Sequence, residues 1–149
     1  MRTEILVLLC SVVPLLSCGG GEMNGAMAAE RSPCVDRIND FRATEGIAPL
    51  KRWVEAEACS DNQSKADSTS GAHANFGDCG ESAQNTCPGW PSTDDVIGGC
   101  LQAMWDEGPG EPFSEHGHYI NMSNPNYTQV ACGFYEMPDG KIWANQNFK

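Results

Sequence analysis

Basic residues are scarce in this chain of 149 residues. Nine lysines and arginines stand against twenty aspartates and glutamates, so the formal net charge is −11. A nucleic-acid ligand requires a stripe of basic side chains that neutralises phosphates, and the sequence has no such stripe. Anionic membrane surfaces would also repel a domain of this charge, whose general effect is to aid solubility. We therefore exclude nucleic acids as partners.

The motifs of several enzyme classes are also absent. The sequence contains no Gly-x-Ser-x-Gly elbow and no His-Glu-x-x-His helix. It has no Cys-x-x-Cys pair, which argues against a zinc cluster built from cysteines. We find no internal repeat. Any hydrolase activity would therefore need side chains brought together from distant segments.

No apolar run is long enough to span a membrane as a helix. The longest run, residues 5–17, follows Arg2 and predicts a signal peptide over residues 1–17. It ends at Cys18 and three glycines, which resembles the lipobox of bacterial lipoproteins. This predicts acylation of Cys18 and a lipid anchor in the bacterial cell envelope, at the outer membrane or cell surface. The alternative is an ordinary cleaved signal with a chance cysteine.

Behind the signal we expect a tether and one domain. Residues 18–31 are rich in Gly, Ala and Met without a period, which predicts a flexible tether. Residues 32–149 suffice for one domain with one modest core.

Six of the eight cysteines remain once Cys10 leaves with the signal and Cys18 is acylated. An even number in a small exported domain predicts three disulfides, for which fifteen pairings exist. We expect Cys79 and Cys87 to pair, because they are close in sequence and flank a loop. The six are Cys34, Cys59, Cys79, Cys87, Cys100 and Cys132.

Apolar periodicity predicts three helices. The first runs from Ser32 to Gly46, with a serine cap and a proline in the first turn. The second spans residues 54–67 and has so few apolar residues that most of it should face water. The third runs from Ser92 to Gly108, and its two internal glycines predict a close approach to a sheet.

The remaining segments predict strands and turns. Residues 81–85 form a short strand, followed by a turn at 88–91 and, further on, a loop at 108–117. Residues 130–134 alternate as a strand should, and 141–148 return as its partner after an Asp-Gly turn. This order of elements predicts an α+β fold, a three-layer α-β-α sandwich.

Several segments resemble the CAP superfamily, which includes cysteine-rich secretory proteins, insect antigen 5 and plant pathogenesis-related proteins. Asn39 is followed by Arg42, a glycine, and then Ile-Ala-Pro-Leu, close to the first-helix pattern of the family. Glu81 follows Gly80 as in the family's Gly-Glu-Asn motif, with serine in place of asparagine. The stretches around His118 and at the C-terminus look like the bacterial SCP-like branch, although the animal and plant pattern after the histidine is absent.

The resemblance implies a shared cleft. In the CAP superfamily, four positions that are occupied here by two histidines and two glutamates line one central cleft. Imidazoles together with carboxylates suit a divalent metal, zinc above all. The competing interpretation is a buried hydrogen-bonded network that specifies the core. His116 could substitute as a ligand, but such a histidine is more often solvated. The predicted metal-site residues are His73, Glu81, Glu107 and His118.

Two functions compete for this cleft. The first is a binding module that presents the cleft to an extracellular lipid, peptide or partner protein. The second is a metal-dependent, peptidase-like hydrolase that uses a glutamate as the base for metal-bound water. We favour the binder, since cysteines in disulfides cannot serve as nucleophiles and no catalytic motif is present. A third option is a structural envelope protein with a vestigial cleft.

Overall fold

The computed structural model describes the backbone of residues 21–149 and the side chains from residue 27 onward. The predicted signal peptide (1–17) and the predicted acylation site at Cys18 lie outside the described residues. Within residues 21–149, no helix combines the length and apolar character that crossing a membrane requires.

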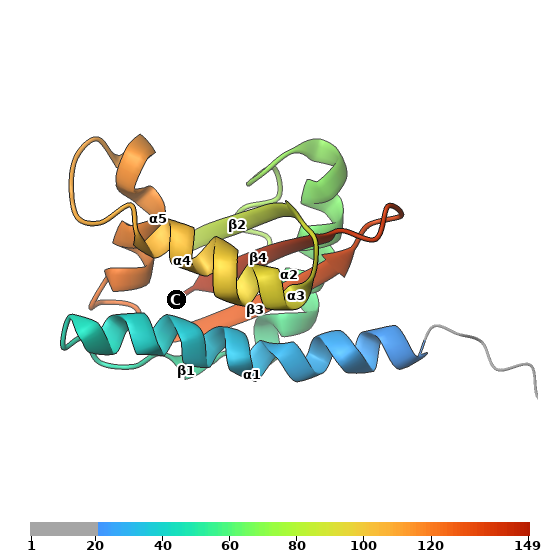
Figure 1. The fold of residues 1–149 in the computed structure, drawn as a ribbon, viewed down its shortest axis with the longest axis horizontal. Helices are drawn as coiled ribbons and strands as arrows, with labels where there is room; N and C mark the ends of the chain where they lie inside the picture. Colours follow the sequence, from blue (N-terminus) through green and yellow to red (C-terminus); the bar gives the residue numbers. More distant parts are fainter. Residues whose placement is uncertain (1–20) are drawn as a thin grey trace, which may run out of the picture.

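A four-stranded sheet forms the middle of the molecule (Figure 1). Strands β3 and β4 form the predicted antiparallel hairpin, and β4 also pairs antiparallel with β2. The short β1, which sequence periodicity missed, pairs parallel with β3. In the order β1-β3-β4-β2, the strands are β1 (Lys51–Arg52), β3 (Gln129–Glu136), β4 (Ile142–Phe148) and β2 (Ala83–Trp90).

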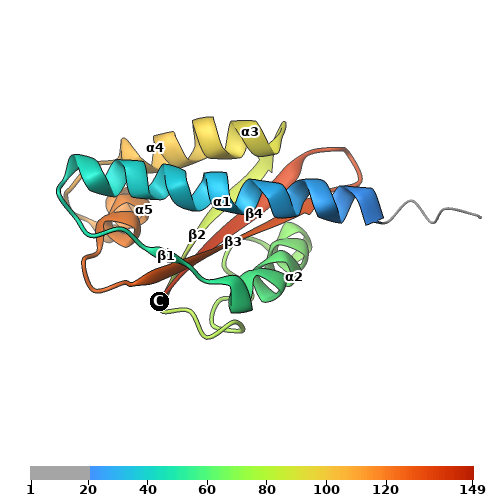
Figure 2. The same ribbon diagram turned by 90° about the horizontal axis from the view of Figure 1, so that it is seen from below.

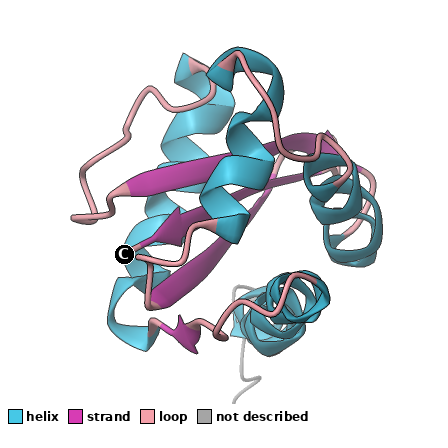
Figure 3. Cartoon of the chain, turned by 90° about the vertical axis from the view of Figure 1, so that its left-hand side faces the viewer, coloured by secondary structure: helices cyan, strands magenta, loops and turns pink. Residues whose placement is uncertain are grey.

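Helices cover both faces of this sheet (Figure 2, Figure 3). Helix α2 packs on one face against β3 and β4, while α1 and the α3–η1–α4 segment pack on the other. Helix α5 follows α4 and contacts β2. The predicted α+β three-layer sandwich is therefore confirmed. The helices are α1 (Gly21–Thr44), α2 (Val54–Ser70), α3 (Thr93–Asp95), the π-helical η1 (Val96–Cys100), α4 (Leu101–Trp105) and α5 (Phe113–Ser123).

Helix α1 is longer than predicted. It begins well before Ser32, and residues 21–31, expected to form a flexible tether, are helical. The side chain of Arg31 forms ion pairs with Glu57 and Asp61 of α2. These contacts tie the early turns of α1 to the domain, which composition alone could not predict.

Two predicted irregular segments are largely regular. Residues 88–91, expected to be a turn, mostly belong to β2, whose pairing with β4 shifts register around Gly89. Gly89 has a φ of +69°, so the turn-forming residues make a β-bulge instead of ending the strand. The predicted loop at 108–117 ends where α5 begins, so His118 lies on a helix.

Two of the three disulfides join a helical segment to the sheet, and the third joins α2 to the segment that follows it. The predicted Cys79–Cys87 bond is wrong. Cys87 of β2 bonds to Cys100 of η1, whereas Cys79 bonds to Cys59 of α2, so the two cysteines face helices on opposite sides of the sheet. The bonds are Cys34–Cys132, Cys59–Cys79 and Cys87–Cys100.

The first-helix pattern of the sequence has a structural role. The Asn39 side chain donates to the carbonyl of Leu50 (3.0 Å) and accepts from its amide (2.7 Å), which fixes the chain after α1. Arg42 is fully buried, and its guanidinium donates to the carbonyls of Met122 (2.7 Å) and Asn124 (3.0 Å). Burial lowers the pKa of this guanidinium. Arg42 thus holds the end of α5 against α1.

The predicted close approach of the third helical segment to the sheet is confirmed at one of its two glycines. A Cβ atom on Gly99 would lie 2.6 Å from the ring of Trp90 in β2. Gly98 has open space instead. Helix α2 buries six of its seventeen residues, and these include the polar side chains Glu57, Gln63 and Asp67.

Candidate functional site

A cavity of about 570 Å³ opens between the start of β2, the segment after α2 and the first turns of α5. His73 and His118 both line it, although they lie far apart in the sequence. The remaining lining residues are aromatic, small or carry an amide or hydroxyl group, and none is a lysine or arginine. They are Phe76, Ser82, Ala83, Gln84, Phe113, Ser114, Gly117, Asn121 and Tyr127.

The His73 ring is oriented by Gln84 on β2. His73 Nδ1 lies 2.9 Å from Gln84 Oε1. The Gln84 amide is itself fixed, because its Nε2 donates to Asn147 Oδ1 (3.0 Å) and Gln63 Oε1 (3.2 Å). An amide oxygen only accepts, so His73 carries its proton on Nδ1 in this network. Its Nε2 is then the ring atom that can accept a bond from a ligand.

The segment that carries His73 is tied down at several points. His73 has a φ of +63°, in the left-handed region that residues with a side chain rarely adopt. Asp67 accepts from the amide (3.0 Å) and side chain (2.8 Å) of Asn75, and Gln63 donates to the Asn75 carbonyl (2.8 Å). The Cys59–Cys79 bond closes the segment onto α2. These contacts hold an unfavourable backbone conformation in place.

Glu81 lies beneath this segment and does not line the cavity. It is 7% exposed, and its two carboxylate oxygens accept from the amides of Gly77 (2.7 Å) and Cys79 (3.0 Å). Gln63 Nε2 donates to the same carboxylate at 2.6 Å. All three bonds stabilise the segment that presents His73.

Glu107 plays a matching part on the other wall. Its Oε1 lies 2.5 Å from His118 Nδ1, and its Oε2 accepts from the His118 amide at 3.0 Å. A carboxylate accepts, so Nδ1 of His118 also carries the proton, and Nε2 is again the atom left for a ligand. Both imidazoles therefore present the same nitrogen.

The rim of the cavity is apolar. Among residues 27–149, three large hydrophobic side chains are exposed, and two of them line this cavity: Phe76 (49%) and Phe113 (58%). They come from different segments, the loop after α2 and the start of α5. Exposed aromatic side chains gathered at one opening are typical of a binding surface.

The four residues predicted as one metal shell are arranged as two pairs. His73 and His118 share the cavity, while Glu81 and Glu107 lie outside its lining and hold the two walls. Within the described part of the chain, no three His, Cys, Asp or Glu side chains lie close enough together to hold a metal ion. Of the four predicted ligands, only the two imidazoles line the cavity.

Comparison with known families decides the classification. The model described as "CAP: Cysteine-rich secretory protein family" matches residues 35–148. The chain belongs to the CAP family. Three disulfides in a CAP protein indicate an extracytoplasmic location.

A solved structure has the same CAP fold. The chain is similar to venom allergen-like protein 4 of Schistosoma mansoni, with a TM-score of 0.56 and 11% sequence identity. The alignment covers 80% of this chain and 89% of the schistosome chain. No curated protein matches this sequence. At this identity the likeness shows the fold alone.

Sequence reasoning missed several residues of this CAP pocket. Gln84 sets the His73 ring, and Asn121, which donates to Asn85 Oδ1 (2.9 Å), lines the floor. Phe76 and Phe113 form the rim. Single polar and aromatic residues carry no periodic signal, so only their place in the fold reveals them.

Proposed function

We propose that this CAP domain is a binding module whose pocket takes an amphipathic ligand, such as a lipid or a peptide with an apolar side chain. The observation that carries the proposal is the meeting of the exposed Phe76 and Phe113 with two imidazoles at one cavity. The aromatic rim suits the apolar part of a ligand, and the imidazole and amide groups below suit its polar end.

No lysine or arginine lines the cavity, and this restricts the charge that the polar end of a ligand can carry. A ligand headgroup with an oxygen acceptor would meet the hydroxyl groups of Ser82 and Ser114. An anionic headgroup would gain no fixed positive charge from the lining itself, and the net charge of −11 opposes its approach. A neutral or metal-bridged headgroup therefore fits best.

A divalent ion such as zinc would be held by Nε2 of His73 and His118. Bound there, it would supply positive charge and open coordination positions for a ligand oxygen. Gln84 and Glu107 support this role, since each holds the other ring nitrogen of its histidine in place. Two protein ligands are fewer than the usual number in zinc sites, so we expect weak binding.

The rim can be tested with matched variants. Isothermal titration calorimetry with the neutral 1-octanol and with Phe-containing tripeptides would measure affinity for the purified, oxidised protein, with and without zinc. Phe76→Ala and Phe113→Ala should each lower the affinity for the probe by about tenfold, since buried aromatic contacts commonly contribute more than about 1 kcal/mol. Val54→Ala is the control, because Val54 is 58% exposed and lies outside the pocket. Equal effects of all three variants, or no binding of either probe, would contradict the binder.

The hydrolase alternative has less support. A general base would need a carboxylate that reaches into the pocket, and both glutamates are engaged by amides and an imidazole instead. Peptide hydrolysis by the zinc-loaded protein that disappears with His73→Ala plus His118→Ala would favour the hydrolase over the binder.

A further inference from the structure

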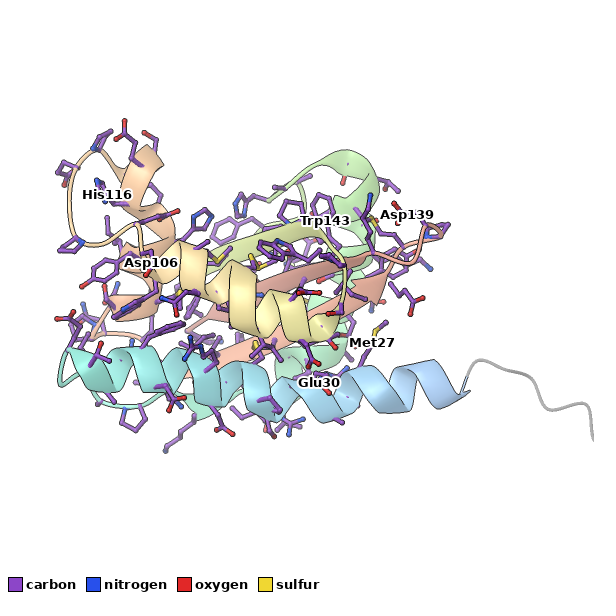
Figure 4. The ribbon with its side chains drawn as sticks, viewed as in Figure 1. Met27, Glu30, Asp106, His116, Asp139 and Trp143 are labelled. Carbon is purple, nitrogen blue, oxygen red and sulfur yellow. A yellow bond between two sulfur atoms is a disulfide. The ribbon has the colours of Figure 1, made fainter. Side chains whose placement is uncertain are left out.

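His116 and Glu107 form a reciprocal link between the end of α4 and the start of α5. The ring of His116 contacts the backbone of Glu107: its Nδ1 lies 2.8 Å from the Glu107 carbonyl oxygen and 3.0 Å from that of Gly108. The side chain of Glu107 in turn contacts the backbone and ring of His118. The side chain of each residue thus bonds to backbone groups in the segment that carries the other. Figure 4 shows His116 beside the loop that joins the two helices.

The chemistry of this link fixes the state of His116. Both partners of Nδ1 are carbonyl oxygens, which only accept, so Nδ1 of His116 carries a proton. A neutral ring and a protonated ring can both donate from Nδ1. His116 is half-buried, and it is not among the residues that line the pocket.

Gly110 provides the space that His116 needs. A Cβ atom on Gly110 would lie 2.5 Å from Nε2, 2.7 Å from Cε1 and 2.9 Å from Cδ2 of the His116 ring. The ring thus packs against the loop that joins α4 to α5. That loop leads into Phe113, the first residue of α5, at the pocket rim.

We propose that His116 is a positioning residue. It fixes the backbone of Glu107, and Glu107 then holds His118 with its proton on Nδ1 and Nε2 presented to the pocket. The consequence for ligand binding rests on the proposed function, but the state of the His118 ring does not.

The test uses two variants that differ only in where an amide donor sits. Asparagine at position 116 places its NH₂ near the position of Nδ1, whereas glutamine places it near Nε2. Long-range ¹H–¹⁵N spectra of ¹⁵N-histidine-labelled full-length protein, recorded above pH 7.5, report the tautomer of each ring. We expect His118 to be in a single Nδ1–H form in the wild type and in His116→Asn. In His116→Gln and His116→Ala, we expect it to mix tautomers, while His73 is unchanged.

A second variant keeps the test decisive if His116→Ala unfolds. Gly110→Ala should displace the ring and reproduce the His118 spectrum of His116→Gln. Added to His116→Ala, the same change should have no further effect, because no ring remains to be displaced. Zinc affinity measured by calorimetry should fall by about tenfold in His116→Gln, the low end of the range for outer-shell partners.

Several outcomes would overturn the proposal. One is a single Nδ1–H form of His118 in His116→Gln. Another is an asparagine variant that behaves like alanine, or a His73 signal that changes as much as that of His118. If zinc and the ligand probes bind nothing while the His118 spectra respond as predicted, the proposed function fails and the positioning role stands.

Discussion

At the scale of single residues, the pocket depends on how two histidines are held. Gln84 and Glu107 each bond to Nδ1 of one ring. Gln84 lies on β2, and His118, the ring that Glu107 holds, lies on α5. The resemblance of the sequence to CAP proteins predicted that His73 and His118 share a cleft. It could not predict that Glu81 holds a backbone segment, because that role depends on amides brought close by folding.

Gly133 is required by the approach of α2 to β3. A Cβ atom there would lie 2.2 Å from the carbonyl carbon of Ser60, a backbone atom that cannot swing away. Gly133→Ala should therefore lower the free energy of unfolding by about 3 kcal/mol, as measured by urea denaturation. Gly98→Ala, at a glycine with open space, should change it by about 1 kcal/mol or less, in the stabilising direction. Similar losses in both variants would contradict this account.

Asp61 predicts a specific dependence of stability on pH. Burial raises its pKa above the ordinary value of 3.8, although the Phe134 amide and Arg31 act in the opposite direction. A raised pKa means that the folded protein holds the proton more tightly than the unfolded chain. Its stabilising contribution is therefore full below the ordinary value and is lost as pH rises through the raised one.

Asp61→Asn removes this titration and keeps an acceptor for the Phe134 amide. The free energy of unfolding of the wild type relative to this variant should fall as pH rises from about 3 to about 6. Urea denaturation across that range measures it. A difference that rises with pH would show that the ion pair with Arg31, and not burial, dominates.

At the scale of elements, the sequence predicted the central hairpin, α2 and the third helical segment, but it missed β1 and α5 and misplaced the ends of α1 and β2. The β3–β4 hairpin follows from the alternation of apolar residues and the Asp-Gly turn. The predicted third helix begins where the structure has a cap, because the Ser92 hydroxyl accepts from the Asp95 amide at 3.1 Å. Helix α1 and β2 run further than expected because tertiary contacts override their prolines and glycines. The disulfide partners depend on which layer each cysteine faces.

The disulfides should differ in their contribution to stability. Cys34–Cys132 closes 98 residues, and Cys87–Cys100 closes 13. In the chain-entropy description a loop near 100 residues contributes about 4.7 kcal/mol and a loop near 15 about 3 kcal/mol. Replacing the long pair by alanines should therefore lower the free energy of unfolding by about 1.5 kcal/mol more than replacing the short pair. Urea denaturation of both variants tests this, and an equal or reversed order would contradict it.

At the scale of the whole molecule, the layers bring the pocket together. The segment that follows α2 supplies one wall, α5 the other, and the start of β2 the floor. The order of elements predicted the sandwich, but not that the rim would be aromatic. That property arises where the segment after α2, which carries Phe76, meets the start of α5, which carries Phe113.

The attachment of the domain to a membrane remains a prediction from the sequence. Cys18→Ser should move the protein from the membrane fraction to the medium or periplasm of an expressing bacterium, because the acyl chains have no other site. Immunoblotting of fractions measures this. A variant that stays in the membrane fraction would contradict acylation at Cys18.

The most direct test of the account is the tautomer of the two pocket histidines in the wild-type protein. Long-range ¹H–¹⁵N spectra above pH 7.5, assigned with His73→Gln and His118→Gln, should show both rings protonated on Nδ1. Addition of zinc should shift the Nε2 signals of both rings together. A proton on Nε2 of either ring, or a response of only one ring, would contradict a pocket that presents two matched nitrogens to its ligand.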